Sequence, residues 1–308
     1  MNMTDVLRRY EPDLRQVEEH LGRYLHSEIP FIPQVINHLI SSGGKRFRPL
    51  MLLASADLCG YRGERRYPLS AVIEFIHTAT LLHDDVVDGA ETRRGRPSAN
   101  NVWGNASVVL VGDFLYSRSF TLMTRDGDLA IIQLISETTN TMAEGEVFQL
   151  LKCGDAGITE EDYFTLIEKK TAVLIAAACA VGALMAGASP DRVEALRAFG
   201  HAMGLAFQLT DDTLDYVAAE KEFGKAIGMD IREGKITLPL IRTLARCTAG
   251  EKETIRGIVE RKQATDEDIA AVFGLIGKYD GIPYALDRAR TIIADGKARL
   301  APFRDGEA

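Results

Sequence analysis

Residues 69–88 read LSAVIEFIHTATLLHDDVVD, a strongly apolar run that ends in three aspartates. The apolar residues recur at i, i+3 and i+4, which is the period of an α-helix. Two other segments, residues 135–151 and 171–187, read ISETTNTMAEGEVFQLL and TAVLIAAACAVGALMAG and are apolar around most of the helical circumference. Helices of this kind lie inside an assembly or at a subunit interface, not on a solvated rim. The sequence therefore predicts a fold made of buried helices.

The helical period continues along the chain, and strand signals are scarce. Prolines and glycines mark the ends of the helical segments. The predicted helices span residues 5–27, 33–41, 49–59, 69–89, 107–123, 128–152, 160–187, 190–218, 237–246, 251–262, 266–279 and 282–300, with longer loops near 89–106 and 218–236. No low-complexity linker divides the chain. We therefore expect an all-α fold in which residues 1–308 form a single domain.

The bulk composition excludes several classes of protein. The 308 residues carry a net charge of -8, which gives no support to nucleic-acid binding, because that usually leaves a basic footprint. The four cysteines are scattered and form no C-x-x-C pair, so we expect free thiols in a reducing compartment. The charged N-terminus lacks a signal-peptide core, and no persuasive apolar stretch of about 18 residues indicates a membrane span. A cytoplasmic location is the expectation.

Two aspartate pairs carry the strongest chemical signal. Asp84 and Asp88 lie four residues apart in LHDDVVD, so their carboxylates share one helix face. Asp211 and Asp215 repeat this spacing in QLTDDTLD, again within an apolar helix. Like charges at this spacing repel unless a cation lies between them, and Mg²⁺ binds one or two carboxylates together with substrate phosphates. A solvated helix end explains one such motif, but two copies in apolar helices favour metal ions clamped around a diphosphate.

Basic residues accompany the first pair. GGKRFRP (residues 43–49) is a glycine-rich turn that feeds a helix with its proline at the first position. The glycines let backbone N–H groups approach an anion, and Lys45 and Arg48 supply positive charge. TRRGR (residues 92–96) follows the pair closely enough to share its ligand. His77 lies seven residues before the pair on the same face, although a core histidine bonded to backbone explains it as well.

A second polar set surrounds the second pair. Lys170 and Thr171 open an apolar helical segment, and Gln208 lies one turn before the pair. GKAIGMD (residues 224–230) and Lys235 follow it. A solvated loop explains each lysine taken singly. Together, two sets of cations flanking two sets of acids suggest two phosphorylated substrates.

These motifs resemble those of the trans-isoprenyl diphosphate synthases, the polyprenyl synthetase family, over residues 43–235. The two aspartate pairs look like that family's two aspartate-rich motifs, D-D-x-x-D, and both are intact. Within the family the chain is most similar to the octaprenyl diphosphate synthase group, on FIHTATLLHDDVVD, LVGDF and FQLTDDTLDY. The resemblance implies an all-helical bundle around a central cavity, a homodimer, and three Mg²⁺ ions, for which Mn²⁺ substitutes.

The resemblance also implies a role for each matching residue. The implied metal ligands are Asp84, Asp88 and Asp211, with Asp85, Asp212 and Asp215 in support. The residues that would hold the allylic diphosphate are Arg93, Lys170, Thr171, Gln208, Lys225 and Lys235. Those that would hold isopentenyl diphosphate are Gly44, Lys45, Arg48, His77 and Arg94. The expected catalytic set comprises Asp84, Asp85, Asp88, Arg93, Lys170, Asp211, Asp212 and Lys225.

The expected reaction lengthens an allylic diphosphate, with farnesyl diphosphate as the expected primer, by units of isopentenyl diphosphate. Thr80 lies one helical turn before the first pair, Ala79 lies beside it, and Ile76 continues the face. A turn rises about 5.4 Å, close to one isoprene unit, so small side chains at 79 and 80 predict a product of about C35 to C45, with about C40 expected. The alternative floors for the growing chain are Phe114, Phe120 and Met123.

Other interpretations stay open at this point. A farnesyl or geranylgeranyl diphosphate synthase would share every motif and differ only in its product. A class I terpene cyclase would leave Gly44, Lys45 and Arg48 unexplained. A non-catalytic subunit of a heteromeric synthase needs neither aspartate pair, and a purely structural helical bundle needs none of these residues. We also expect transient membrane contact during product release, although no basic amphipathic helix marks its location.

Overall fold

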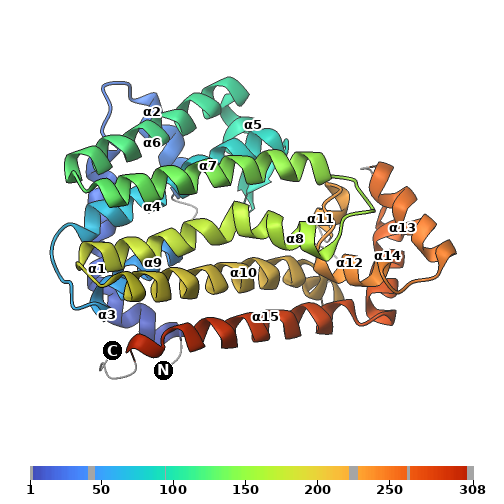
Figure 1. Ribbon diagram of the computed structural model, residues 1–308. Helices are drawn as coiled ribbons and strands as arrows, with labels where there is room; N and C mark the ends of the chain where they lie inside the picture. Colours follow the sequence, from blue (N-terminus) through green and yellow to red (C-terminus); the bar gives the residue numbers. More distant parts are fainter. Residues whose placement is uncertain (1–2, 41–45, 94, 222–227, 262–263, 304–308) are drawn as a thin grey trace. The chain divides into compact units, whose positions relative to one another are not determined.

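The computed structural model describes residues 3–40, 46–93, 95–221, 228–261 and 264–303, and within them the chain is almost entirely helical (Figure 1). The all-α prediction is confirmed. The chain divides into two compact units. The N-terminal unit comprises Met1–Thr139, Ala177–Arg197 and Pro302–Ala308, and the C-terminal unit comprises Asn140–Ala176 and Ala198–Ala301.

The elements follow one another with short connections. The first are α1 (Met3–Tyr24), α2 (Phe31–Ile40), α3 (Phe47–Leu58), α4 (Arg66–Val87), β1 (Thr92–Arg93), β2 (Arg96–Pro97), α5 (Ala99–Trp103) and α6 (Asn105–Asp126). Next come α7 (Leu129–Lys152), α8 (Glu160–Ile167), the π-helix η1 (Glu168–Ala172), α9 (Val173–Met185) and α10 (Pro190–Lys221). The last are α11 (Met229–Arg232), α12 (Leu238–Leu244), α13 (Ala249–Arg261), α14 (Asp266–Lys278), α15 (Gly281–Arg299) and the 3₁₀ turn η2 (Ala301–Phe303).

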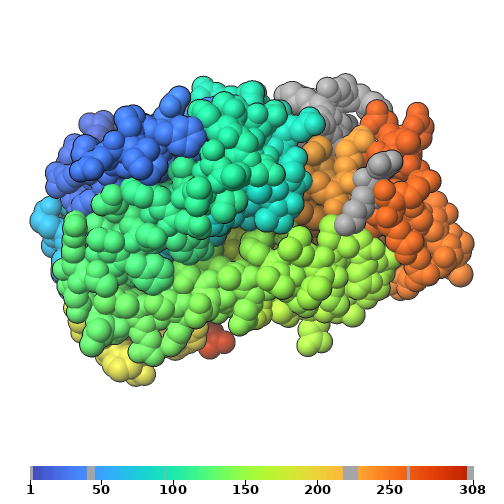
Figure 2. Space-filling view, turned by 90° about the horizontal axis from the view of Figure 1, so that it is seen from above, coloured from blue at the N-terminus to red at the C-terminus, as the bar shows by residue number. Residues whose placement is uncertain are grey.

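The N-terminal unit is built around α4. This helix packs most extensively against α6 and also contacts α1, α2, α3 and α5. Residues 69–76 are all buried, so every side of the helix is covered there. This is the physical reason for its continuous apolar run. On the face shown in Figure 2, the side chains of α2, α5 and α6, coloured blue to green, form a continuous surface over this unit.

The C-terminal unit has its own apolar core. Its buried side chains come from α8, α10 and α12–α15, for example Leu209, Leu238, Ile255 and Val272. The short helix α12 contacts α8, α14 and α15. This core holds α8 and α10, which carry the second aspartate pair and its neighbours.

The helix predicted over residues 160–187 is present from Glu160 to Met185, but the π-helix η1 breaks its regular α-helical hydrogen bonding, which the sequence did not predict. Two glycines of the same unit let η1 approach its neighbours closely. A Cβ added at Gly145 of α7 would lie 2.8 Å from Cβ of Lys169, and one at Gly204 of α10 would lie 2.5 Å from Cα of Ala172. A π-turn disturbs the regular hydrogen bonding of an α-helix and is frequently found at functional sites.

Other predicted boundaries also need correction. The loop predicted near 89–106 contains the antiparallel hairpin β1–β2 and the short helix α5, and the loop near 218–236 contains α11. The proline of GGKRFRP is the third residue of α3 instead of its first, because the helix begins at Phe47. The four cysteines are free, as predicted. Within the described residues, no helix is long and apolar enough to cross a membrane.

The close approach of α10 to η1 gives a test of the packing. Gly204→Ala should lower the free energy of unfolding by about 1–3 kcal/mol, because the new methyl group overlaps the backbone of Ala172. Gly257→Ala in α13 is the matched control, since a Cβ there meets nothing within 4 Å. That control should raise stability by about 0.5–1 kcal/mol. Urea denaturation measures both, and equal stabilities of the two variants would contradict the packing.

Candidate functional site: two aspartate-rich helices

The first aspartate pair lies at the C-terminal end of α4, in the N-terminal unit. The backbone N–H of Asp88 donates to the carbonyl oxygen of Asp84 at 2.8 Å, so the helical turn is intact. Asp84 is half-buried and Asp88 is exposed. The two carboxylates therefore lie one turn apart, as their spacing predicts, on a side of the helix that reaches solvent.

The middle aspartate of this motif has an internal partner. Asp85 is 1% exposed, and its Oδ1 accepts a hydrogen bond from Nε of Arg93 at 2.7 Å and forms an ion pair with Nη2 at the same distance. The carbonyl oxygen of Asp85 also accepts from the N–H of Ala90 at 2.9 Å. These contacts fasten the β1–β2 hairpin to α4, so Arg93 lies beside the first pair. Arg94 lies outside the described residues.

Two residues predicted for isopentenyl diphosphate meet in the same unit. Nη1 of Arg48 donates to Nε2 of His77 at 3.1 Å, so this ring nitrogen is an acceptor. Burial lowers the pKa of the Arg48 guanidinium, and the negative charge of Glu74 opposes that shift. Gly44 and Lys45 lie outside the part of the chain that the structure describes.

Arg46, which the sequence argument does not select, anchors this segment. Its φ of 44° is in the left-handed region, which residues other than glycine rarely adopt. Its guanidinium forms an ion pair with Glu74 at 2.6 Å and another with Glu18. The signal for this contact was Glu74 itself, because a carboxylate in an apolar helix must be paired when buried.

The second aspartate pair lies on α10, in the C-terminal unit. Asp211 is exposed, Asp215 is half-buried, and the apolar side chains of Phe207 and Leu214 are 43% and 52% exposed beside them. Desolvation raises the pKa of both carboxyl groups. Oδ2 of Asp215 also accepts a long hydrogen bond, 3.4 Å, from the N–H of Asp230.

The middle aspartate is again held internally. Oδ1 of Asp212 accepts from Nε2 of Gln208 at 2.7 Å, and Oδ2 accepts from the hydroxyl of Tyr163 on α8 at 2.6 Å. Oε1 of Gln208 in turn accepts from the hydroxyl of Thr171 at 2.9 Å. Burial raises the pKa of Asp212 to about 6, and the hydrogen bonds from Tyr163 and Gln208 act in the opposite direction. The structure thus joins Thr171, Gln208 and Asp212, and adds Tyr163.

The π-helix η1 presents Lys170 next to this network. Nζ of Lys170 lies 2.8 Å from Oε2 of Glu146 on α7, and the neighbouring Lys169 pairs with Glu144 at 2.5 Å. Glu146 is a second residue that the sequence argument misses. Its position as an acid within a predicted apolar helix was the available signal.

A short loop completes the C-terminal unit's polar region. The N–H of Lys235 donates to the carbonyl oxygen of Asp230 at 2.7 Å, and its Nζ lies 2.7 Å from Oε2 of Glu233. Burial, followed by the charges of Asp212 and Asp215, raises the pKa of Asp230 well above its usual range. Lys225 lies outside the described residues.

The carboxylates of the two motifs fit a metal ion that is also coordinated by oxygens of a bound substrate. Among the described residues, no group of three or more His, Cys, Asp or Glu side chains could hold a metal ion alone. Each unit instead offers an i, i+4 carboxylate pair, which suits Mg²⁺ because that ion keeps water and phosphate oxygens as ligands. Metal binding by Asp84, Asp88 and Asp211 stays a prediction.

The raised pKa of Asp212 predicts a pH dependence of stability in the presence of a chelator. Because the folded carboxyl group binds its proton more tightly than the unfolded one, its contribution is present below pH 4 and is lost as pH rises through about 6. Asp212→Asn should therefore gain stability relative to the unsubstituted chain between pH 4 and about 6.5. Urea unfolding at several pH values measures this difference.

Asp162, in the capping box of α8, supplies a control of opposite sign. Hydrogen bonds from the Thr159 backbone and the Lys152 side chain lower its pKa, so its stabilisation is present above pH 4 and lost as pH falls. Asp162→Asn should lose stability relative to the unsubstituted chain as pH rises. The same trend in both variants would contradict the assignment at Asp212.

Comparison with known proteins agrees with these features. Residues 29–276 match the family model of polyprenyl synthetase. Octaprenyl diphosphate synthase of Escherichia coli is 42% identical over 261 residues, which cover 85% of this chain and 81% of that protein. The crystal structure of a decaprenyl diphosphate synthase from Rhodobacter capsulatus has a TM-score of 0.94 at 40% identity and covers 98% of this chain and 94% of its own.

A polyprenyl synthase from Caulobacter crescentus, crystallised with calcium and isoprenyl diphosphate, has a TM-score of 0.93 at 41% identity. It covers 99% of this chain and 93% of its own. These likenesses confirm the predicted fold class and the predicted enzyme class, a prenyltransferase that makes polyprenyl diphosphates. The chain is a member of the polyprenyl synthetase family.

Proposed function

We propose that this prenyltransferase extends farnesyl diphosphate with isopentenyl diphosphate to an all-trans product of about C40, and that residues 1–308 act as one catalytic domain. The observation that carries the proposal is the duplicated aspartate motif. In both copies the middle aspartate has an internal partner, so ligand binding falls to the outer pair. The similarity to octaprenyl and decaprenyl diphosphate synthases supports a long product.

The proposed roles follow the motifs. Asp84, Asp88 and Asp211 would hold Mg²⁺, three ions in all, and these ions when bound supply positive charge beside the diphosphate. The residues proposed to hold the allylic diphosphate are Arg93, Lys170, Thr171, Gln208, Lys225 and Lys235. The residues proposed to hold isopentenyl diphosphate are Gly44, Lys45, Arg48, His77 and Arg94.

The chemistry needs charge stabilisation and a dry site. The bond between the allylic C1 and its diphosphate oxygen breaks, and the cations stabilise the charge that develops on the leaving group. The alkene of isopentenyl diphosphate attacks C1, and a proton is lost to form the new allylic double bond. The released diphosphate is the proposed acceptor of that proton. Water must be excluded because it would trap the carbocation.

Two of these cations are already oriented by carboxylates. Arg93 is held by Asp85 and Lys170 by Glu146, at 2.7 and 2.8 Å. Side chains fixed in this way lose less conformational entropy when an anion binds. The internal carboxylates therefore favour a pre-organised diphosphate site.

The product length depends on the face of α4 before Asp84. Ile76 and Ala79 are fully buried, whereas Thr80 is half-buried and its hydroxyl donates to the carbonyl oxygen of His77 at 2.8 Å. Thr80 is therefore favoured over Ala79 as the side chain that meets the growing chain. Of the alternative floors, Met123 is fully buried. The Phe114 ring is covered by the Arg118 guanidinium, whose Cζ lies 4.9 Å from the centroid of the ring.

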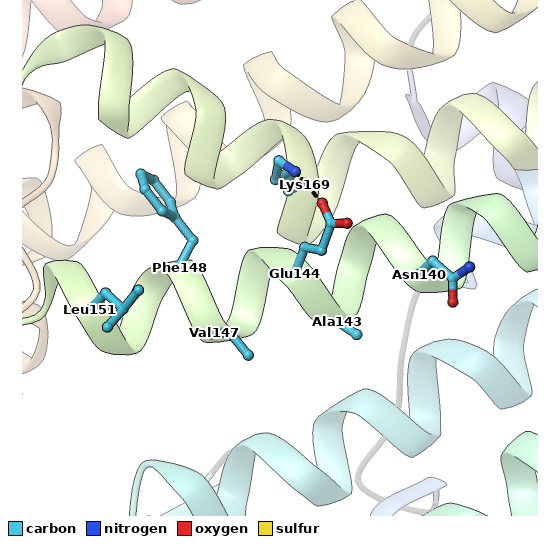
Figure 3. A pocket seen from close by; sticks show the side chains of 7 residues that line it. All are labelled: Asn140, Ala143, Glu144, Val147, Phe148, Leu151 and Lys169. Atoms are coloured by element: carbon cyan, nitrogen blue, oxygen red, sulfur yellow. Dashed lines mark hydrogen bonds and ion pairs between the residues drawn. The ribbon is translucent and has the colours of Figure 1, made fainter.

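The exposed face of α7 supports a homodimer. Val147, Leu150 and Leu151 are 58%, 56% and 75% exposed. A pocket of about 620 Å³ lies on this face, lined by Asn140, Ala143, Glu144, Val147, Phe148, Leu151 and Lys169 (Figure 3). A second copy of the chain is the proposed cover for these apolar groups, because solvent-exposed leucines clustered on one helix are typical of subunit interfaces. A cytoplasmic location and transient membrane contact stay predictions.

Incubation of the purified chain with Mg²⁺, farnesyl diphosphate and labelled isopentenyl diphosphate tests the proposal. We expect a product of about C40, since no aromatic side chain stands at residues 79 or 80. Chain-length analysis, repeated with geranyl and geranylgeranyl diphosphate, is the measurement. Products that stop at about C15 to C20 would support the short-chain alternative, and no incorporation by folded protein would support a non-catalytic subunit.

Substitution on α4 tests the part that concerns chain length. Thr80→Phe should shorten the main product by about two to four isoprene units, because the ring would block the face that precedes Asp84. Ala79→Phe should shorten it less and destabilise the fold, since Ala79 is fully buried. Product length is a property of the active molecules only, so a misfolded fraction does not distort it. An unchanged product from Thr80→Phe would overturn the proposal that this face limits the chain.

A further inference from the structure

Tyr163 is a buried residue that no motif of the family resemblance includes. It lies on α8 and is 2% exposed, and its ring packs edge-on against Phe164 with 5.7 Å between centroids. Its hydroxyl donates to Oδ2 of Asp212 on α10 at 2.6 Å. A buried tyrosine hydroxyl needs a partner, and here the partner is a carboxylate of the second aspartate motif.

The hydrogen bond at Asp212 is one end of a chain of three. Because an ionised carboxylate only accepts, Gln208 must turn its NH₂ group toward Oδ1 of Asp212. The carbonyl oxygen of Gln208 then faces Thr171, whose hydroxyl donates to it. The orientation of Gln208 and Thr171 therefore depends on where the carboxylate of Asp212 is held.

Tyr163 and Gln208 together hold that carboxylate. Each of them occupies one of its oxygens, and both oxygens are turned toward α8 and the body of α10. Successive residues of an α-helix point about 100° apart, so Asp211, which is exposed, points away from this contact. Without the hydroxyl, Oδ2 of the half-buried Asp212 would lose the donor that holds it against α8, and the side chain would rotate or take up a proton.

We propose that Tyr163 is the positioning residue of the second aspartate motif: it fixes Asp212 and, through it, the Gln208 and Thr171 side chains that face the allylic diphosphate. The inference rests on the proposed function for the identity of that ligand. Because Tyr163 is buried and its hydroxyl is bonded to Asp212, its effect should appear in binding of the allylic diphosphate and Mg²⁺ and not in binding of isopentenyl diphosphate.

The test compares Tyr163→Phe with Tyr284→Phe. Both variants keep the ring and remove one hydrogen bond to a carboxylate in the same unit, since the hydroxyl of Tyr284 donates to Glu160 at 2.7 Å. Tyr163→Phe should raise the KM for the allylic diphosphate, and the Mg²⁺ concentration for half-maximal rate, by about tenfold. The KM for isopentenyl diphosphate should change less than about twofold in either variant.

A measurement without turnover separates positioning from catalysis. Calorimetric titration with micromolar inorganic diphosphate in Mg²⁺ should show about tenfold weaker binding by Tyr163→Phe and unchanged binding by Tyr284→Phe. Equal binding by the two variants, in a preparation whose unsubstituted chain makes product, overturns the inference and leaves the proposed function intact. An unsubstituted chain that makes no product overturns the proposed function instead.

A double-mutant cycle tests whether Tyr163 acts through Asp212. With Asp212→Asn in place, no ionised oxygen remains for the hydroxyl to hold, so adding Tyr163→Phe should weaken diphosphate binding less than about twofold. A further loss of about tenfold in the double variant would show independent effects and overturn the inference. If Tyr163→Phe alone fails to fold, the double variant can still be compared with Asp212→Asn, because neither of these has an ionised oxygen at residue 212.

Discussion

The structure depends on one constraint, which is that an ionised carboxylate inside an apolar helix must have a partner. Asp85 and Asp212 meet it in the same way, each as the middle residue of its motif. Arg93 covers the first, and Tyr163 with Gln208 covers the second. Asp212 has a donor on each oxygen, whereas Asp85 has Arg93 on Oδ1 and a buried Oδ2 that accepts no hydrogen bond within the described residues. Because each middle carboxylate has a partner in its own unit, the outer aspartates stay on a side that reaches solvent.

The irregular elements next to each motif provide the partners of the middle aspartate or of its neighbours. The β1–β2 hairpin brings Arg93 back to α4 through a hydrogen bond between Ala90 and the carbonyl oxygen of Asp85. In the C-terminal unit, the extra residue of the π-helix turns Thr171 toward α10 while Lys170 reaches α7. Glycines in α7 and α10 leave room for the wider π-turn, because a Cβ at either position would overlap it. The hairpin and the π-helix therefore position side chains of the two motifs, in addition to connecting helices.

The sequence predicts what is local and misses what is distant. The helix starts at Glu160, Pro190 and Asp266 agree with the prediction, because the helical period and the prolines and glycines near helix ends are local features of the sequence. The i, i+4 aspartate pairs are predicted for the same reason. The π-helix is missed because the residues that pack closely against it, Gly145 and Gly204, lie on other helices, and Tyr163 is missed because its partner is 49 residues away. A contact of that kind leaves no periodic pattern in one sequence.

The same pairing explains how an acidic chain can hold an acidic ligand. The net charge of -8 says little about the site, because the cations there are held individually by carboxylates of their own unit. Before a ligand arrives, Lys170 with Glu146 and Arg93 with Asp85 are close to neutral as pairs, so neither is an isolated buried charge. When a diphosphate binds, Arg93 and Lys170 therefore exchange carboxylate oxygens for phosphate oxygens as partners without moving far. For such an exchange the orientation of the two side chains matters more than the total charge of the chain.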